Sequence, residues 1–278
     1  MIGLILISLG SLFEEISNSI GKKKVGQKKQ SVYSLGVLQL LSGTCAFALI
    51  TFVNSSSFVF SLASLLTFIP RVILEIVGLH ITLIAMVRAD RTTFSFIRVG
   101  TIPLLLVTDM ILGYSLRSWQ TIGIILIIVS ISLVFIGRKM SRASTNLVIL
   151  STIIAVLTIS LFKYNITHFN SVVAEELLVY LFLFFYFVVL SVWIYKENPF
   201  KLLLRPVFAA QSVSFGVTVV LVGFAYLFAA ASVITAAKRA SALLWSLISG
   251  NVYFKETNFL FKLSMVGLLV SGLIMLAL

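Results

Sequence analysis

The sequence predicts an all-α integral membrane protein with ten transmembrane helices, arranged as two inverted five-helix repeats. Three observations lead to this fold class. The 278 residues are 60% hydrophobic and only 11% charged, whereas about a quarter of the residues in soluble domains are charged. Apolar runs follow one another at about the 20 residues that a helix needs to cross a bilayer. The final helices of the two halves also share a pattern of polar residues.

Polar breaks divide the chain into ten apolar stretches, and each stretch is continuously apolar rather than alternating, which excludes a β-barrel. The first stretch is interpreted as a span and not as a cleaved signal peptide, because no basic segment precedes it. The predicted spans are 2–20, 32–53, 58–87, 92–112, 119–136, 147–162, 172–195, 202–228, 232–254 and 260–278.

The loop charges orient these spans. Fifteen of the 21 Lys and Arg residues fall in loops on one side, two fall in loops on the other side, and four lie inside spans. The positive-inside rule places the basic side in the cytoplasm, so both termini are predicted to face outward across a cell membrane. The basic residues of the cytoplasmic loops also account for the net charge of +12, so no nucleic-acid partner is needed to explain it.

The motifs that would indicate catalysis are absent from the sequence. There is no Walker A motif and no metalloprotease or hydrolase signature, and the loops leave no room for a soluble catalytic domain. Only two histidines, His80 and His168, and one cysteine, Cys45, are present, which disfavours a metal centre and excludes an internal disulfide. The sequence therefore predicts neither an enzyme nor a bound cofactor.

The two halves, 1–142 and 143–278, are predicted to be repeats. Segments 96–137 and 236–276 each begin with a basic residue in an apolar run, pass through a tight polar turn and end in a Gly/Ser-containing span. Because five is odd, the second unit inserts upside down relative to the first. Inverted repeats place a substrate site near the midplane, and rocking one half against the other gives alternating access.

At these turns the sequence resembles the EamA branch of the drug/metabolite transporter superfamily. Phe254-Lys255-Glu256 followed by Lys262 looks like the family's turn between the fourth and fifth span of a repeat. In the first half, Gly113, Gln120 and Gly123 keep the family spacing, whereas Tyr114 stands where an acid is usual. The resemblance implies a ten-helix transporter of small metabolites, often an exporter.

Eight charged residues, four acidic and four basic, lie inside the predicted spans away from their ends, and such residues usually face a cavity or a partner. They are Glu14, Glu15, Glu75, Asp109, Arg71, Arg98, Lys238 and Arg239. The equal numbers also allow a purely structural role in ion pairs between helices. Arg71 and Glu75, four residues apart, are expected to pair along their own helix. Glu175 and Glu176 are expected at the outer surface.

The candidate substrate-binding residues are chosen by helical face. Glu15 lies in a polar stripe of the first span, which predicts a water-filled cavity, although such a stripe also suits close helix packing. Arg98 shares a face with Asp109, and Lys238 and Arg239 occupy the corresponding place in the second half; snorkelling of this pair to the interface is the alternative. Trp245 and Gln211 complete the set: Glu15, Arg98, Asp109, Gln211, Lys238, Arg239 and Trp245.

The sequence thus predicts a secondary active transporter, an exporter or exchanger, of a small polar metabolite by alternating access. The intramembrane cations favour an anionic or zwitterionic substrate, and protons are a possible coupling ion. Two other interpretations remain open: an intramembrane enzyme or lipid-handling protein acting on a membrane-soluble substrate, and a structural subunit. A carrier should bring Glu15, Arg98 and Lys238 or Arg239 to one central cavity.

Overall fold

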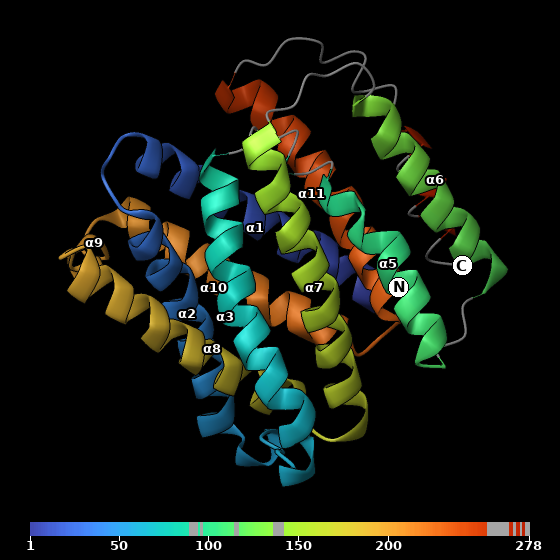
Figure 1. Ribbon diagram of the computed structural model, residues 1–278, viewed down its shortest axis with the longest axis horizontal. Helices are drawn as coiled ribbons and strands as arrows, with labels where there is room; N and C mark the ends of the chain where they lie inside the picture. Colours follow the sequence, from blue (N-terminus) through green and yellow to red (C-terminus); the bar gives the residue numbers. More distant parts are fainter. Residues whose placement is uncertain are drawn as a thin grey trace.

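The computed structural model describes residues 1–88, 94, 97–113, 117–135, 142–254, 267–268, 271–272 and 274–275, and all regular structure in these residues is helical (Figure 1). The α-helices are α1 Ile2–Gly26, α2 Val32–Val53, α3 Leu65–Arg88, α5 Thr101–Ile111, α6 Ser118–Phe135, α7 Arg142–His168, α8 Val172–Val189, α9 Pro199–Leu202, α10 Pro206–Ala225 and α11 Ala231–Phe254. Short 3₁₀ turns, Ser55–Ser57 and Leu62–Ser64, precede α3, and a π-helical turn, Leu190–Ile194, ends α8.

Five helical segments of the described chain are long and apolar enough to cross a membrane: Val32–Val53, Ser55–Arg88, Thr145–His168, Val172–Ile194 and Pro206–Ala225. Large apolar side chains on their outer surfaces are exposed, as Phe52 and Leu66 are at 87% and 85%. Such a surface suits lipid rather than water. Helices α1 and α11 are equally long but carry charged residues in their middle turns, notably Glu14 and Lys238.

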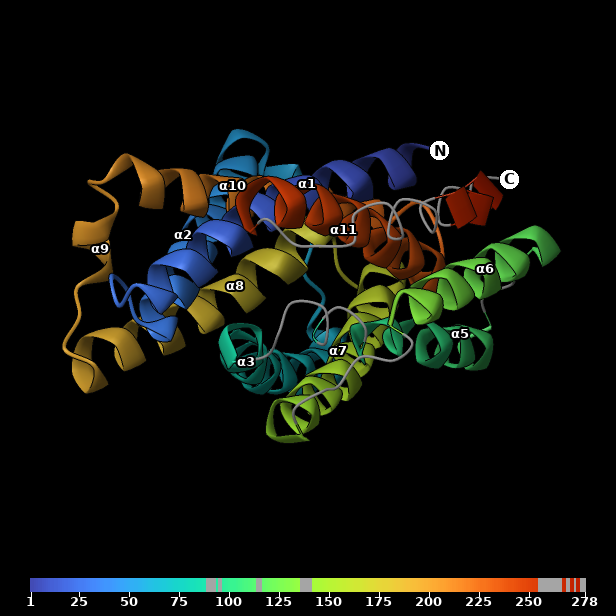
Figure 2. The ribbon, with the colours of Figure 1, turned by 90° about the horizontal axis from the view of Figure 1, so that it is seen from above.

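The helices form two layers that do not follow the order of the chain. Helix α1 packs along α10 and α11, and α10 also packs along α2. On the other side α3 packs along α7, which in turn contacts α5. Figure 2 shows α1, α10 and α11 on one side of the molecule and α3 and α7 on the other, with α8 in contact with α2 and α3. Each layer therefore contains helices from both halves of the sequence.

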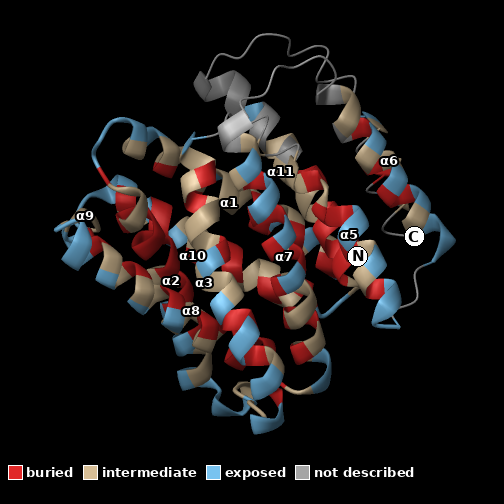
Figure 3. Ribbon diagram, in the orientation of Figure 1, coloured by how far each residue is buried: buried red, intermediate tan, exposed pale blue. Residues whose placement is uncertain are grey.

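Small residues allow the backbones within the first layer to approach closely. A Cβ atom added at Gly216 of α10 would lie 2.6 Å from the Ser42 Cβ of α2, which is too near for any side chain. The Ser42 and Ser212 hydroxyls lie 2.6 Å apart across the same contact. Figure 3 shows that buried residues gather between the helices, while exposed residues face outward. Close contact through Gly and Ser is typical of helices packed inside a membrane.

Two helix starts have the same local construction. Ser31 caps α2 by accepting a hydrogen bond from the Ser34 amide at 3.0 Å, and Ser171 caps α8 by accepting one from the Ala174 amide at 3.2 Å. A side-chain oxygen at this position satisfies one of the amide groups that have no partner within the helix. A buried amide residue precedes each serine: Gln30 is 3% exposed and Asn170 is 5% exposed.

The helix boundaries agree with several of the predicted spans. Helix α2 coincides with the predicted span 32–53, and α11 begins one residue before its span. Lys163, one of the two basic residues assigned to loops on the outer side because it follows the predicted span 147–162, instead lies within α7, where its ammonium group donates to the Tyr226 carbonyl at 2.6 Å. Most of the predicted span 260–278 lies outside the described residues, as do Tyr114, Lys255, Glu256 and Lys262 of the expected repeat turns.

Candidate functional site

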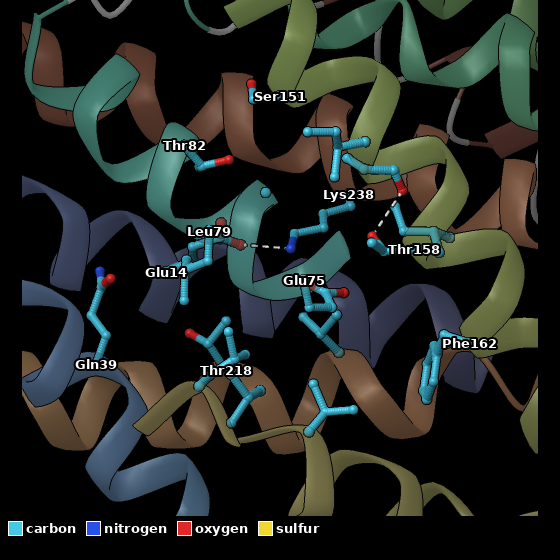
Figure 4. Close-up of a pocket in the computed structure, with 18 of the residues that line it drawn as sticks. Glu14, Gln39, Glu75, Leu79, Thr82, Ser151, Thr158, Phe162, Thr218 and Lys238 are labelled. Atoms are coloured by element: carbon cyan, nitrogen blue, oxygen red, sulfur yellow. Dashed lines mark hydrogen bonds and ion pairs between the residues drawn. The ribbon is translucent and has the colours of Figure 1, made fainter. Parts of the chain in front are cut away.

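A cavity of about 240 Å³ lies between the two helix layers. Its wall is formed by side chains of α1, α2, α3, α7, α8, α10 and α11, together with Phe94 and Arg98. Because both halves of the chain contribute, no single half could form this space alone. Figure 4 shows Glu14, Glu75 and Lys238 grouped around it.

An ion pair joins the two polar helices of the first layer inside this cavity. The Lys238 ammonium of α11 lies 2.9 Å from a Glu14 carboxylate oxygen of α1. The two side chains are 20% and 25% exposed, although the paired Glu14 oxygen is itself buried. Beside them, the Ser11 hydroxyl donates to the Lys238 carbonyl at 3.4 Å, and the Asn18 amide oxygen accepts from Gln39 of α2 at 3.0 Å.

Two arginines of the cavity have no carboxylate partner among the described residues. Arg98 lies 5.2 Å from the centre of the Phe94 ring, and its buried Nε has no hydrogen-bond partner. Arg239 reaches only the Thr101 hydroxyl, at 3.4 Å. A guanidinium group in a water-poor site is stabilised by a carboxylate or a phosphate that binds its parallel N–H groups. The pair therefore has the chemistry of an anion site.

A second charged cluster closes the other end of the cavity. Arg71 of α3 lies 2.8 Å from Glu175 and 2.6 Å from Glu176, both on α8. Asn165 donates to Glu175 at 2.7 Å, and Asn170 donates to the other oxygen of the same carboxylate at 2.5 Å. These side chains are almost fully buried. We refer to Arg71, Glu175, Glu176, Asn165 and Asn170 as the Arg71 cluster.

The Arg71 cluster corrects two expectations. Arg71 does not pair with Glu75 along its own helix, because two carboxylates of α8 approach its guanidinium directly and Phe162 covers it at 4.5 Å. Glu175 and Glu176 are not surface residues either, since they are 0% and 8% exposed. An ion pair between residues four apart on one helix stabilises it only weakly, whereas a charge-assisted hydrogen bond to a facing helix is stronger.

Glu75 is left facing the cavity without a hydrogen bond or ion pair among the described residues. It lines the same space as Arg71, Arg98 and Glu176. Hydroxyl groups and aromatic rings make up much of the remaining wall. The hydroxyl-bearing residues are Thr82, Ser151, Thr158, Thr218 and Thr235, and the aromatic residues are Phe94, Phe162, Tyr180, Phe215 and Tyr226. Such a mixed wall suits a small polar molecule with an apolar part.

The structure brings three of the seven predicted site residues together: Arg98, Lys238 and Arg239 all line the cavity. Glu15 does not line it; its carboxylate accepts from Ser19 at 3.0 Å, and its neighbour Glu14 lines the cavity in its place. The charged triad expected of a central cavity is therefore present with Glu14 in the position assigned to Glu15.

The other three predicted residues lie outside the cavity wall and have local roles. Asp109 is 1% exposed and accepts the Ser232 amide at 2.7 Å, at the start of α11. Gln211 is fully buried and accepts from Gln30 at 3.5 Å. The Trp245 indole donates to the Ser8 carbonyl at 3.1 Å.

Sequence reasoning missed Glu14, Glu75 and Glu176 as cavity residues. Ser11, Glu14 and Asn18 recur at helical spacing, and so do the polar residues of the stripe through Glu15. Periodicity alone therefore cannot decide which of the two adjacent glutamates faces the cavity. Glu75 was expected to pair with Arg71. It is left to line the cavity because Arg71 pairs with carboxylates of α8 instead.

The comparisons with known proteins leave the family open. No protein-family model matches the chain, and a search of curated proteins finds no significant relative. Within the described residues, no group of three His, Cys, Asp or Glu side chains is arranged to hold a metal ion.

Proposed function

We propose that this protein is a secondary transporter of a small polar metabolite that carries a carboxylate or phosphate group. The observation that carries the proposal is the cavity between the two layers, in which Arg98 and Arg239 present two guanidinium groups with no carboxylate partner among the described residues. Both guanidinium groups interact electrostatically with Glu14, and Arg98 also with Glu75, but no described carboxylate binds their N–H groups directly. An anionic substrate would supply those charge-assisted hydrogen bonds.

We further propose that the chain is a ten-helix inverted repeat. The packing of α1 along α10 and of α7 along α3 supports it, because α1 would correspond to α7 and α3 to α10, so the two pairs exchange when the two halves are interchanged. The two capped helix starts give independent support. Gln30-Ser31-Val32 and Asn170-Ser171-Val172 are similar in sequence. Each serine amide bonds to the segment before the third long helix of the other half: Ser31 to Glu197, before α10, at 3.0 Å, and Ser171 to Val59, before α3, at 2.8 Å.

Alternating access follows from this arrangement. The Arg71 cluster holds α3 against the first turns of α8. Beyond the other end of α8, Ser31 bonds to Glu197 of the α8–α9 connection, and Gln30 contacts Gln211 of α10. Opening one set of contacts while the other remains closed would expose the cavity to one side at a time. The loop charges place the Lys22–Lys29 end in the cytoplasm and both termini outside.

A thermal-shift screen of the purified protein tests the ligand class. We would compare carboxylates, phosphate monoesters, amino acids and quaternary ammonium compounds, because a ligand that binds the native state raises the apparent melting temperature by mass action. Anionic or zwitterionic hits are expected, with at least a tenfold loss of affinity in Arg98→Gln because a charge-assisted contact is lost. Lys201→Gln, which removes an exposed cation of α9, is the matched control.

The same hits would then be tested for exchange across liposomes containing the protein. Hits confined to cations, or anion binding that Arg98→Gln leaves unchanged, would contradict the proposed site. Binding of lipid-like compounds without exchange of any soluble hit would instead favour a lipid-handling protein.

A further inference from the structure

Aromatic side chains from three helices gather at one end of the molecule. They are Tyr33 in the first turn of α2, His80 of α3, Tyr186 in the last turn of α8, and Tyr195 directly after the π-helical turn. The centre of the Tyr33 ring lies 4.4 Å from that of Tyr195 and 5.5 Å from that of His80. His80 Nδ1 lies 2.8 Å from the Tyr186 hydroxyl. We refer to these four residues as the tyrosine–histidine cluster.

The tyrosine–histidine cluster is separate from the central cavity and reaches the molecular surface. None of its four members lines that cavity, and all are at least partly exposed, with Tyr195 at 52%. The neighbouring exposed side chains at the end of α8 are apolar or aromatic, namely Val189, Val192, Trp193 and Ile194. Tyrosine and tryptophan rings are typical of the interface between a membrane and water. The cluster therefore has the composition of a surface at headgroup level that continues into a lipid-facing apolar surface.

This end of the molecule is strongly basic. The α1–α2 connection and the α8–α9 connection meet there, because the Ser31 amide and the Ser34 hydroxyl donate to Glu197 at 3.0 and 2.6 Å (Figures 1 and 2). Five lysines lie between residues 22 and 29, and Arg88, Lys196, Lys201 and Arg205 add four further cations. Within 22–31 and 195–206, Glu197 is the only acidic residue. Arg88, at the end of α3, also interacts electrostatically with Tyr33 of the cluster.

Two lysines beside the cluster share an unusual backbone conformation. Lys28 and Lys196 have φ angles of 55° and 52°, and no other non-glycine residue in the described part of the chain has a positive φ. Each follows the end of a helix, where glycine is usual because it has no Cβ. Strained residues persist where the side chain has a function. A cation at this position also interacts favourably with the helix dipole, so a test has to separate ligand binding from helix capping.

Loop orientation accounts for the number of cations at this end, but it does not account for the hydroxyl and imidazole groups that converge beside them. A phosphodiester oxygen accepts hydrogen bonds from hydroxyl, imidazole and ammonium groups, and charge-assisted contacts of this kind are the stronger ones. The adjoining exposed side chains of α8 offer apolar surface on which acyl chains can lie. A soluble phosphate ester would gain nothing from that surface, whereas a phospholipid would use both parts of it.

We propose that the tyrosine–histidine cluster, together with Lys28, Lys196 and Arg88, binds the headgroup of an anionic phospholipid whose acyl chains lie against the end of α8. Such a lipid would contact α2 and α3 of the first half and α8 of the second. The proposal does not rest on the transport function, because the site shares no residue with the central cavity.

Native mass spectrometry of the full-length protein, released from detergent micelles, tests the ligand class. The probes are phosphatidylglycerol, phosphatidylcholine and glycerol 3-phosphate. We expect phosphatidylglycerol to bind about tenfold or more tightly than phosphatidylcholine, because only the former carries a net negative charge. Glycerol 3-phosphate at the same concentration should not bind. Equal binding of the two lipids overturns the proposal, and so does binding of glycerol 3-phosphate as tight as that of the lipid.

Glycine substitutions at the two strained lysines separate lipid binding from helix capping. Lys28→Gly and Lys196→Gly should each weaken phosphatidylglycerol binding about fivefold, and the double variant about thirtyfold. Thermal unfolding without lipid should be unchanged or shifted upward, because glycine adopts a positive φ without strain. Arg117→Gln, on the connection between α5 and α6, is the control and should bind normally. A loss of stability without a loss of lipid affinity would assign both lysines to capping and would overturn their role in the site.

Removing one hydroxyl distinguishes a built site from diffuse attraction by the loop charges. Tyr33→Phe keeps the ring contact with Tyr195 but removes the hydroxyl, and it should weaken phosphatidylglycerol binding about tenfold because a hydrogen bond to a charged group is lost. Tyr164→Phe is the matched control, since Tyr164 of α7 stacks on His168 in a similar pair elsewhere in the structure. Unchanged affinity in Tyr33→Phe, or an equal loss in Tyr164→Phe, overturns the proposed site.

Discussion

The Arg71 cluster and the Glu14–Lys238 pair are both ion pairs between helices, yet their surroundings differ. The Arg71, Glu175 and Glu176 side chains are 3%, 0% and 10% exposed, and two asparagines donate to Glu175. The Lys238 and Glu14 side chains are 20% and 25% exposed and open onto the cavity. The first is a sealed network with several fixed contacts; the second is a single contact between two partly exposed side chains.

This difference separates a structural role from a binding role. A buried charge that loses its partner is left uncompensated, so a sealed network strongly opposes any change in its geometry. A pair that faces water loses little when it opens, because water replaces the lost contact. We therefore expect the Arg71 cluster to hold α3 and α8 together, and the Glu14–Lys238 pair to rearrange when a ligand enters.

The largest effect is expected from removing the cation of the sealed network. Arg71→Met leaves Glu175 and Glu176 buried without their partner and should lower the free energy of unfolding by about 3–5 kcal/mol. Unfolding in mixed detergent micelles, followed by circular dichroism, measures the loss. An effect no greater than that of Lys201→Met, an exposed site on α9, would show that the cluster does not hold the layers together.

A smaller effect is expected from the amide groups that flank the two closed ends. Asn170→Ala removes donors to Ser64 at 3.0 Å and to Glu175 at 2.5 Å and should cost about 1–3 kcal/mol, since one acceptor is a charged group. Gln30→Ala removes two long contacts of 3.4 and 3.5 Å and should cost less. The same unfolding measurement ranks the two variants. Equal losses, or a larger loss for Gln30→Ala, would remove the distinction between the ends.

The smallest effect is expected from the open pair. A double-mutant cycle with Glu14→Gln and Lys238→Gln should give a coupling energy of at most about 1 kcal/mol, because both side chains retain contact with water. The coupling is obtained from unfolding free energies of the two single variants and the double variant. A coupling of several kcal/mol would place this pair in the same class as the Arg71 cluster and would make it a poor site for ligand entry.

The sequence predicted the local structure better than the contacts between helices. Helix α2 was placed correctly at both ends because polar residues bound its apolar run; in the structure Ser31 caps its start and Asn54 follows its last turn. The all-helical fold followed from composition and run length alone. Charged residues inside predicted membrane spans are unusual, so the sequence could single them out as candidates. Three of the residues chosen in this way, Arg98, Lys238 and Arg239, do line the same cavity.

Partner choice could not be predicted because it depends on the rotation and packing of helices far apart in sequence. Arg71 had a plausible partner four residues away, but the structure brings two carboxylates more than a hundred residues distant to the same guanidinium. Glu14 and Glu15 differ by one helical step of about 100°, and only the position of α11 decides which of them meets Lys238.

The mixing of the two halves within each layer has a consequence for how the chain becomes stable. Helix α1 buries its surface mainly against α10 and α11, α2 against α10 and α8, and α3 against α7, so a chain that stops near residue 142 lacks most of its packing partners. During synthesis the helices of the first half therefore lack most of their native packing contacts until the second half has been inserted into the bilayer. Native packing is thus acquired late and cooperatively, and the two halves, produced as separate chains, should assemble only with each other.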